Sequence, residues 1–361
     1  MEQMYLQLIH NKKNIIALLF AITLLACSKE QGKPDIYTAT PYTLTTPANF
    51  PQPILSSVNP LSIEGIKLGR MLYYDPILST NGRTCNSCHI QSKSYSSPIF
   101  TTPIGVKISV PPHINLAWNK DYNWNGSEPE LDRLCLGDFG PSFFNTNMPQ
   151  LVQKLKSHSS YPTLFKQAFN VDDIESLSNN ELQLKIVYSI SQFMRTMISY
   201  NSKFDKVIRH ETMLTPQEYD GFETFYTERG DCFHCHGYPL LTSNNFINNG
   251  LDSNYETINF GRYSVSLDSS DIGKFSTPTL RNIELTAPYM HDGRFSTLED
   301  VVNFYDSGVH WTSPNIDPLM TKPNKEFGLH LTAAQKSNLV LFLKTFTDTS
   351  YINNSSFQNP H

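Results

Sequence analysis

The feature that most constrains this chain is a pair of five-residue motifs, each of the form Cys-x-x-Cys-His. They lie at residues 85–89 and 232–236. Two thiols at this spacing can bond to the two vinyl groups of one porphyrin, and the following His can then bind the iron. A zinc site and a disulfide pair are the alternatives, but zinc would require four clustered ligands, and these motifs are far apart in sequence. The repeat therefore predicts two covalently bound haem c groups.

Length, charge and Cys content limit what else the chain can be. Its 361 residues are enough for two domains of ordinary size. The net charge of −5 argues against nucleic acid as a partner and suits a cationic redox partner. Of the six Cys, the two motifs use four. We expect Cys135 to be a buried, small apolar side chain.

The N-terminus has the pattern of an export signal. Lys12 and Lys13 precede an apolar stretch, 15–25, that is too short to span a bilayer. The run that ends in Ala26 and Cys27 is similar to a bacterial lipobox, so we expect lipidation of Cys27. An ordinary signal peptide or a short anchor helix is the alternative. The expected location is the periplasm or outer membrane, or the cell surface, with a lipid anchor in the membrane. Covalent haem attachment also takes place outside the cytoplasm, which agrees with export.

Composition and helical spacing suggest five segments. The segment after Cys27 is rich in Pro and Thr and is expected to be a flexible tether. Apolar residues recur at helical spacing over 61–74, while Thr215 and Thr332 each begin a capping box. The predicted segments are a signal peptide (1–27), the tether (28–55), an N-terminal cytochrome c domain (56–204), a C-terminal cytochrome c domain (205–350) and a tail (351–361).

Longer motifs accompany the haem motifs. Residues 277–282 read Thr-Pro-Thr-Leu-Arg-Asn, 287–293 read Ala-Pro-Tyr-Met-His-Asp-Gly, and Trp124 stands two residues before Gly126. With these motifs, residues 56–348 resemble the bacterial dihaem cytochrome c peroxidases, a family that includes the MauG-like enzymes. The resemblance implies a mainly α fold of two cytochrome c-like helical domains, each with one covalently bound c-type haem. It also implies peroxide chemistry at the N-terminal haem and electron transfer at the C-terminal haem.

The resemblance suggests a sixth iron ligand at the second haem, opposite His236. In the peroxidases this ligand is a Met that follows the His of the Pro-Tyr-x-His motif by fourteen residues. Counting from His291 gives Tyr305, and the MauG-like branch also has Tyr there. A phenol oxygen favours oxidised iron more than a thioether does. Met290, Met320 or the absence of a sixth ligand are the alternatives.

At the first haem, with His89 as proximal ligand, the family's displaceable His is missing. The corresponding position is Gly105 or Val106, and neither can bind iron. The sequence therefore predicts that this iron is five-coordinate at rest. His113 is the nearest spare His, and we expect it to be structural.

The proton-transferring group of the first site is also altered. The family places a Glu directly before a Met, whereas this chain has Asn147 before Met148. An amide forms hydrogen bonds but does not carry a proton between peroxide oxygens. Asp138, Glu128 and Glu130 are the candidate replacements.

Further roles follow from the resemblance. Trp124 would lie between the two haems and carry electrons, with core packing as the alternative. Arg281 would contact a haem propionate, or else form a surface ion pair. A calcium ion between the domains would be bound by Thr286 and Pro288, with Ser109 where the family has Asn.

Two functions remain open. The first is a cytochrome c peroxidase-like enzyme that reduces hydrogen peroxide at the N-terminal haem with electrons relayed through the C-terminal haem, with a MauG-like variant that oxidises another substrate. Its electrons would come from a small redox protein or cytochrome, and a homodimer is compatible with the family. The alternative is a non-enzymatic, membrane-tethered dihaem electron-transfer protein.

Overall fold

The structure is a computed structural model that describes residues 37–102, 105–256, 259–323, 325 and 328–361. The predicted signal peptide, Cys27 and the first part of the predicted tether lie outside these residues. Among the described residues, no helix is both long and apolar enough to cross a membrane.

The first half is built on a pair of helices, α2 (Ile63–Tyr74) and α5 (Asn179–Arg195), which pack against each other. The Ser62 side chain caps α2, which ends at Tyr74 because Asp75 precedes Pro76 and adopts an extended conformation. A Cβ atom added at Gly69 would lie 1.8 Å from the Ser189 carbonyl oxygen of α5. Gly69 therefore permits this close crossing.

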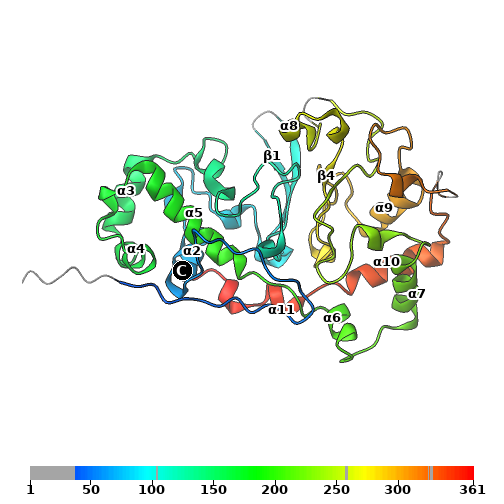
Figure 1. Ribbon diagram of the computed structural model, residues 1–361, viewed down its shortest axis with the longest axis horizontal. Coiled ribbons are helices and arrows are strands. Elements are labelled where there is room, and N and C mark those ends of the chain that lie inside the picture. The colour runs from blue at the N-terminus through cyan, green and yellow to red at the C-terminus, as the bar shows by residue number, and fades with distance from the viewer. Residues whose placement is uncertain (1–36, 103–104, 257–258, 324, 326–327) are drawn as a thin grey trace, which may run out of the picture. The chain divides into compact units, whose positions relative to one another are not determined.

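The second half uses the same device. Its central pair is α7 (Pro216–Tyr226) and α10 (Ala333–Lys344), and both predicted capping boxes, at Thr215 and Thr332, are confirmed. A Cβ atom at Gly221 would lie 2.1 Å from the Asn338 carbonyl oxygen. Each half is thus centred on two helices that touch at a glycine, and Figure 1 shows both pairs.

The remaining elements are short and confirm the mainly α fold. The strands form two antiparallel pairs: β1 (Ser97–Thr101) with β2 (Lys107–Val110), and β3 (Phe246–Ile247) with β4 (Phe275–Ser276). The other α-helices are α3 (Met148–Ser157), α4 (Tyr161–Phe169), α6 (Lys203–Ile208), α8 (Tyr263–Ser266), α9 (Leu298–Asn303) and α11 (Thr349–Ile352).

Separate apolar cores lie under the two helix pairs, within one compact unit, Thr38–His361. Phe204 already belongs to the second core, close to the predicted boundary at 205. The predicted tail, 351–361, packs against the first half. Tyr351 and Phe357 are buried in the first core, and the Tyr74 hydroxyl donates to the Phe357 carbonyl. Figure 1 shows this chain end returning past α11 to α2.

Part of the predicted tether is also packed. We call residues 38–55 the N-terminal strap. Phe50 meets Trp118 edge to face, with ring centroids 5.2 Å apart, and Trp118 donates to the Pro51 carbonyl. Asn49 donates to the Tyr238 hydroxyl of the second half. The prediction of flexibility is wrong for the strap, because apolar residues among the prolines give it a buried face.

Candidate functional site

The first Cys-x-x-Cys-His motif opens onto a cavity of about 610 Å³. Cys85, Cys88 and His89 all line it, and both thiols are free. The motif begins with a 3-10 turn, Cys85–Ser87, so the His89 amide donates back to the Cys85 carbonyl. This local turn brings the two thiols and the imidazole to one wall of the cavity.

The His89 ring is oriented by a backbone carbonyl. Its Nδ1 lies 2.9 Å from the Tyr95 oxygen, and because a carbonyl only accepts, Nδ1 carries the proton. Burial lowers the pKa of His89 to about 4. The imidazole is therefore neutral, with Nε2 left free, which is the form that binds a metal.

The second motif repeats this arrangement. The Nδ1 of His236 donates to the Leu241 carbonyl over 3.1 Å, and burial lowers the pKa of His236 to about 4. Tyr95 and Leu241 both have positive φ, 58° and 55°, which turns each carbonyl back toward its His. Both motifs present free thiols and a neutral imidazole, so both fit a covalently bound haem.

The second cavity is smaller, about 240 Å³, and the predicted sixth iron ligand lies in its wall. Cys232, Cys235 and His236 line it together with the three side chains that the sequence analysis weighed as sixth iron ligand. These are the predicted ligand and its two alternatives: Tyr305, Met290 and Met320. Tyr305 lies in a single π-helical turn, Phe304–Gly308, a rare feature that is frequent at functional sites.

Asn249, which the sequence analysis missed, distinguishes these candidates. Its amide donates to the Tyr305 hydroxyl over 3.1 Å and lies 3.8 Å from the Met290 sulfur. Burial raises the pKa of Tyr305 to about 12, and the Asn249 hydrogen bond opposes that rise. A donor on the phenol oxygen stabilises phenolate, so Asn249 favours Tyr305 as an oxygen ligand. No motif pointed to Asn249, because it lies far from Tyr305 in the sequence.

Trp124 lines both cavities. Its indole nitrogen donates to the Ser109 carbonyl over 2.6 Å, while its own carbonyl accepts from Ser276. These bonds come from one residue of each half and hold Trp124 where the two cavities adjoin. This is the position implied for Trp124 by the family resemblance.

Asp138 is the acidic candidate that lies at the first cavity. It is half-buried among the lining residues, and its carboxylate accepts a hydrogen bond from Cys135. Burial raises the pKa of Asp138 to about 7. Cys135 is buried, as expected, but it also lines the cavity and contacts an ionisable group.

The other acidic candidates and Asn147 lie outside this lining. Glu128 and Glu130 are absent from the described residues that line the first cavity. Asn147 is exposed, and its side chain caps α3 by accepting from the Gln150 amide over 3.1 Å. This geometry supports a structural role for Asn147.

Two His residues have defined partners. The His113 ring stacks on the His89 ring with centroids 3.5 Å apart, and His113 Nδ1 lies 3.1 Å from the Tyr73 hydroxyl. His113 thus lies beside the proximal imidazole, which supports the structural role expected for it. His291 lines the second cavity, stacks on Phe275 and pairs with Asn259.

Arg281 is not among the described residues that line either cavity. It is 1% exposed, and its guanidinium pairs with both oxygens of Asp205 over 2.9 Å. Two further bonds from the guanidinium go to the Pro239 carbonyl. Arg281 therefore forms an ion pair, as the alternative proposed, but the pair is buried and not at the surface. The predicted propionate contact stays a prediction.

The predicted calcium donors converge. Ser109, Thr286 and Pro288 all line the second cavity, and the Ser109 hydroxyl donates to the Pro288 carbonyl over 3.2 Å. The Ser109 amide donates to the His291 carbonyl. Oxygen atoms from two segments therefore meet here, but a hydrogen bond already joins two of them.

Comparison with known proteins identifies one group of relatives. Residues 63–213 match the family described as di-haem cytochrome c peroxidase. Cytochrome c551 peroxidase of Nitrosomonas europaea is 32% identical over 310 residues, which cover 83% of this chain and 85% of the relative. Methylamine utilization protein MauG of Methylorubrum extorquens is 28% identical over 307 residues, covering 83% and 82%.

A solved structure agrees with these relatives. The crystal structure of a MauG-like protein associated with microbial copper homeostasis aligns with a TM-score of 0.79 at 30% identity. The alignment covers 88% of this chain and 99% of that one.

Proposed function

Because this chain belongs to the di-haem cytochrome c peroxidase family, we propose that it reduces hydrogen peroxide at the first cavity with electrons that pass Trp124 from the second. The chain is a peroxidase-type oxidoreductase with two haem c groups. The relatives named as peroxidases favour an enzyme over a non-enzymatic relay. The bound haems supply the iron that exchanges electrons, and the residues below do the rest.

The observation that carries the proposal is the place of Trp124 in the walls of both cavities. An indole there shortens the distance that an electron must cross between the two sites. The hydrogen bond to Ser109 fixes the ring, so the path does not depend on a mobile side chain. Electrons would enter at the second site from a small redox protein or cytochrome.

We assign proton transfer to Asp138. Reduction of one hydrogen peroxide to two waters consumes two electrons and two protons, and it breaks the O–O bond. The Asp138 carboxylate accepts the proton of one peroxide oxygen and returns it to the other oxygen, which leaves as water. Its position on the first cavity and its pKa of about 7 suit both halves of this transfer.

The electron path is tested with Trp124→Phe, and Trp118→Phe is the matched control. Trp118 is equally an indole, is buried, and does not belong to the described lining of either cavity. After one equivalent of peroxide is added to the half-reduced protein, stopped-flow spectra report oxidation of the second haem. We expect this rate to fall at least about tenfold in Trp124→Phe and to stay unchanged in Trp118→Phe. Equal rates in both variants would remove Trp124 from the path.

The proton path is tested with Asp138→Asn, and Asn147→Ala is the control from outside the cavity. The second-order rate constant for peroxide should fall by about 10²–10⁴-fold in Asp138→Asn. Asn147→Ala should react like the parent protein. A normal rate in Asp138→Asn would assign the proton transfer elsewhere.

A MauG-like variant is the second candidate, and the Asn249–Tyr305 hydrogen bond favours it. An oxygen ligand at the second site stabilises oxidised iron. The haems, once oxidised by peroxide, would then take electrons from a second substrate instead of from a redox-protein donor. Two measurements distinguish the variant from the peroxidase. The MauG-like variant should consume peroxide without an added electron donor, and mass spectrometry should detect oxidation of a co-incubated protein.

Three further features belong to the proposal: a calcium site, lipidation and the location of the protein. Calcium would bind near Ser109 with the carbonyls of Thr286 and Pro288. We expect a dissociation constant of roughly 10⁻⁴–10⁻³ M, because the donors are neutral. Metal analysis before and after chelation tests it. The lipobox at Cys27 supports lipidation and a periplasmic, outer-membrane or surface location. In cell fractions, Cys27→Ser should move the protein from membrane to soluble fractions.

A further inference from the structure

We propose that Asn282 is a positioning residue. It joins the loop that follows the first proximal His, His89, to the loop that follows the second, His236. Through this contact, the second half of the molecule sets the position of the proximal ligand of the first haem. The proposal rests on the two haem sites described above, but not on peroxide as the substrate. It assigns a role to the Thr-Pro-Thr-Leu-Arg-Asn motif, whose Arg281 lies outside the described lining of both haem cavities.

The first part of this motif holds the second loop, residues 237–241. The Thr279 hydroxyl donates to the Leu240 carbonyl over 2.7 Å. The Leu280 amide donates to the Leu241 carbonyl over 3.1 Å, and this same carbonyl accepts from His236. The motif backbone therefore supports the atom that orients the second proximal imidazole.

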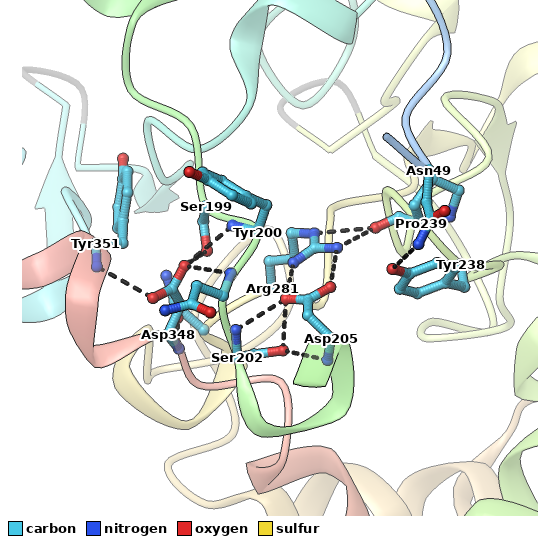
Figure 2. A network of polar contacts seen from close by, with 12 residues as sticks. Asn49, Ser199, Tyr200, Ser202, Asp205, Tyr238, Pro239, Arg281, Asp348 and Tyr351 are labelled. Carbon is cyan, nitrogen blue, oxygen red and sulfur yellow. Dashed lines mark hydrogen bonds and ion pairs between the residues drawn. The ribbon is translucent and has the colours of Figure 1, made fainter. Parts of the chain in front are cut away.

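Arg281 makes this support rigid. Its guanidinium binds the Pro239 carbonyl of the second loop and both carboxylate oxygens of Asp205. Asp205 in turn accepts from the Ser202 amide and hydroxyl. Figure 2 shows these groups around the buried guanidinium. A bidentate, fully buried ion pair tolerates little displacement, because movement would leave a desolvated charge unpaired.

The last residue of the motif reaches the other loop. The Asn282 side chain donates to the Ser94 hydroxyl over 2.8 Å, and its carbonyl oxygen accepts from the Asp348 amide. The Asn282 backbone amide donates to the Phe346 carbonyl over 3.1 Å. Asn282 and Ser94 are both 0% exposed, so no water replaces a lost contact without rearrangement.

Ser94 directly precedes the residue that orients the first proximal imidazole. Tyr95 provides the carbonyl that accepts from His89, and Ser94 and Tyr95 have consecutive positive φ values of 56° and 58°. A shift of the Ser94 side chain is therefore passed to the Tyr95 peptide. The strength of the hydrogen bond from His89 to the Tyr95 carbonyl sets how strongly the imidazole donates to iron, and hence the reduction potential of the first haem.

Two connections thus join the two sites. Trp124 joins the cavities, and Asn282 joins the proximal loops behind them. The Trp124 connection suits electron transfer. The Asn282 connection lets the second half of the molecule adjust the position of His89.

The test is Ser94→Ala in the haem-loaded protein, with Thr279→Val as the matched control. Ser94→Ala removes the acceptor of the Asn282 side-chain amide. Thr279→Val removes the hydroxyl that donates to the Leu240 carbonyl of the second loop and accepts from the Arg281 amide, and it leaves the Asn282–Ser94 contact intact. Spectroelectrochemistry without peroxide gives the midpoint potential of each haem, and resonance Raman gives the iron–His stretching frequency of the ferrous first haem. We expect Ser94→Ala to shift both quantities at the first haem more than at the second. Thr279→Val should shift the second haem more than the first.

A purely structural contact would behave differently. It would lower the melting temperature of Ser94→Ala while the potential and the iron–His frequency of the first haem stayed at parent values, and that result overturns the proposal. If Ser94→Ala does not fold, Ser94→Gly removes the same hydroxyl and suits the positive φ. Because these are equilibrium measurements without peroxide, they are independent of the Trp124 and Asp138 experiments.

Discussion

The two haem cavities have the same proximal side and different remaining walls. In each, the imidazole Nδ1 donates to the carbonyl of a positive-φ residue five or six positions along the chain. The first cavity, about 610 Å³, has Asp138 in its wall. The second, about 240 Å³, has Tyr305 and two Met side chains.

The attachment motif alone therefore does not decide what a haem site does. Attachment and the proximal ligand come from five consecutive residues, so they are alike in both sites. The differing groups come from other segments: Asp138 follows its motif by about fifty residues, and Tyr305 by about seventy. A roomy site with an acid suits a small oxidant, whereas a site filled by potential ligands suits electron storage.

The largest expected effect is a pH dependence confined to the first site. Burial raises the pKa of Asp138 to about 7, so the proton-accepting carboxylate predominates above that pH. The peroxide rate constant should be level at high pH and fall about tenfold per unit below pH 7, or roughly a hundredfold at pH 5. Stopped-flow rates across this range provide the measurement. The profile should become flat in Asp138→Asn, and a sloping profile in that variant would point to another acid.

The next effect concerns the second site. Replacement of a phenol oxygen by a thioether stabilises reduced iron, so Tyr305→Met should raise the potential of the second haem by on the order of 100 mV. The potential of the first haem should not move. Tyr289→Phe is the control, because it removes a different phenol from the same cavity wall. An unchanged potentiometric titration of Tyr305→Met would exclude Tyr305 as a ligand.

A smaller effect should be equal in the two halves, because their helix pairs are built alike. Gly69→Ala and Gly221→Ala each place a methyl against a partner-helix carbonyl. Each should lower the free energy of unfolding by about 2 kcal/mol, measured by denaturant titration. Gly137→Ala is the control, since no atom of the described residues lies within 4 Å of the position that its methyl group would occupy. A much smaller loss for one variant would show that its helix pair adjusts more readily.

The smallest effect separates a helix cap from a catalytic group. Asn147→Ala removes the side chain that caps α3 and should cost about 1 kcal/mol of stability, with no change in the peroxide rate. Asn147→Asp keeps a capping oxygen and should retain stability. A slower peroxide reaction in both variants would show that Asn147 takes part in the reaction with peroxide.

Much of the fold and the local geometry of the two haem motifs was predictable because the determining interactions are local. The spacing of Cys and His, the capping boxes at Thr215 and Thr332, and the helical period over 61–74 all act within a few residues. The failures involve longer separations. The strap was predicted to be flexible, and the packing of the residues after 350 was not predicted, because the surfaces that bury Phe50 and Phe357 come from distant parts of the chain.

The sequence by itself determined that there are two haem motifs, and it predicted which Cys residues attach each haem and which His binds each iron. Only the tertiary structure decided that Asp138 faces the first cavity while Asn147 caps a helix, that Asn249 contacts Tyr305, and that Arg281 pairs with Asp205. The physical reason is separation along the chain. A motif closes within one turn of backbone, whereas these side-chain partners meet only after the helix pairs have packed.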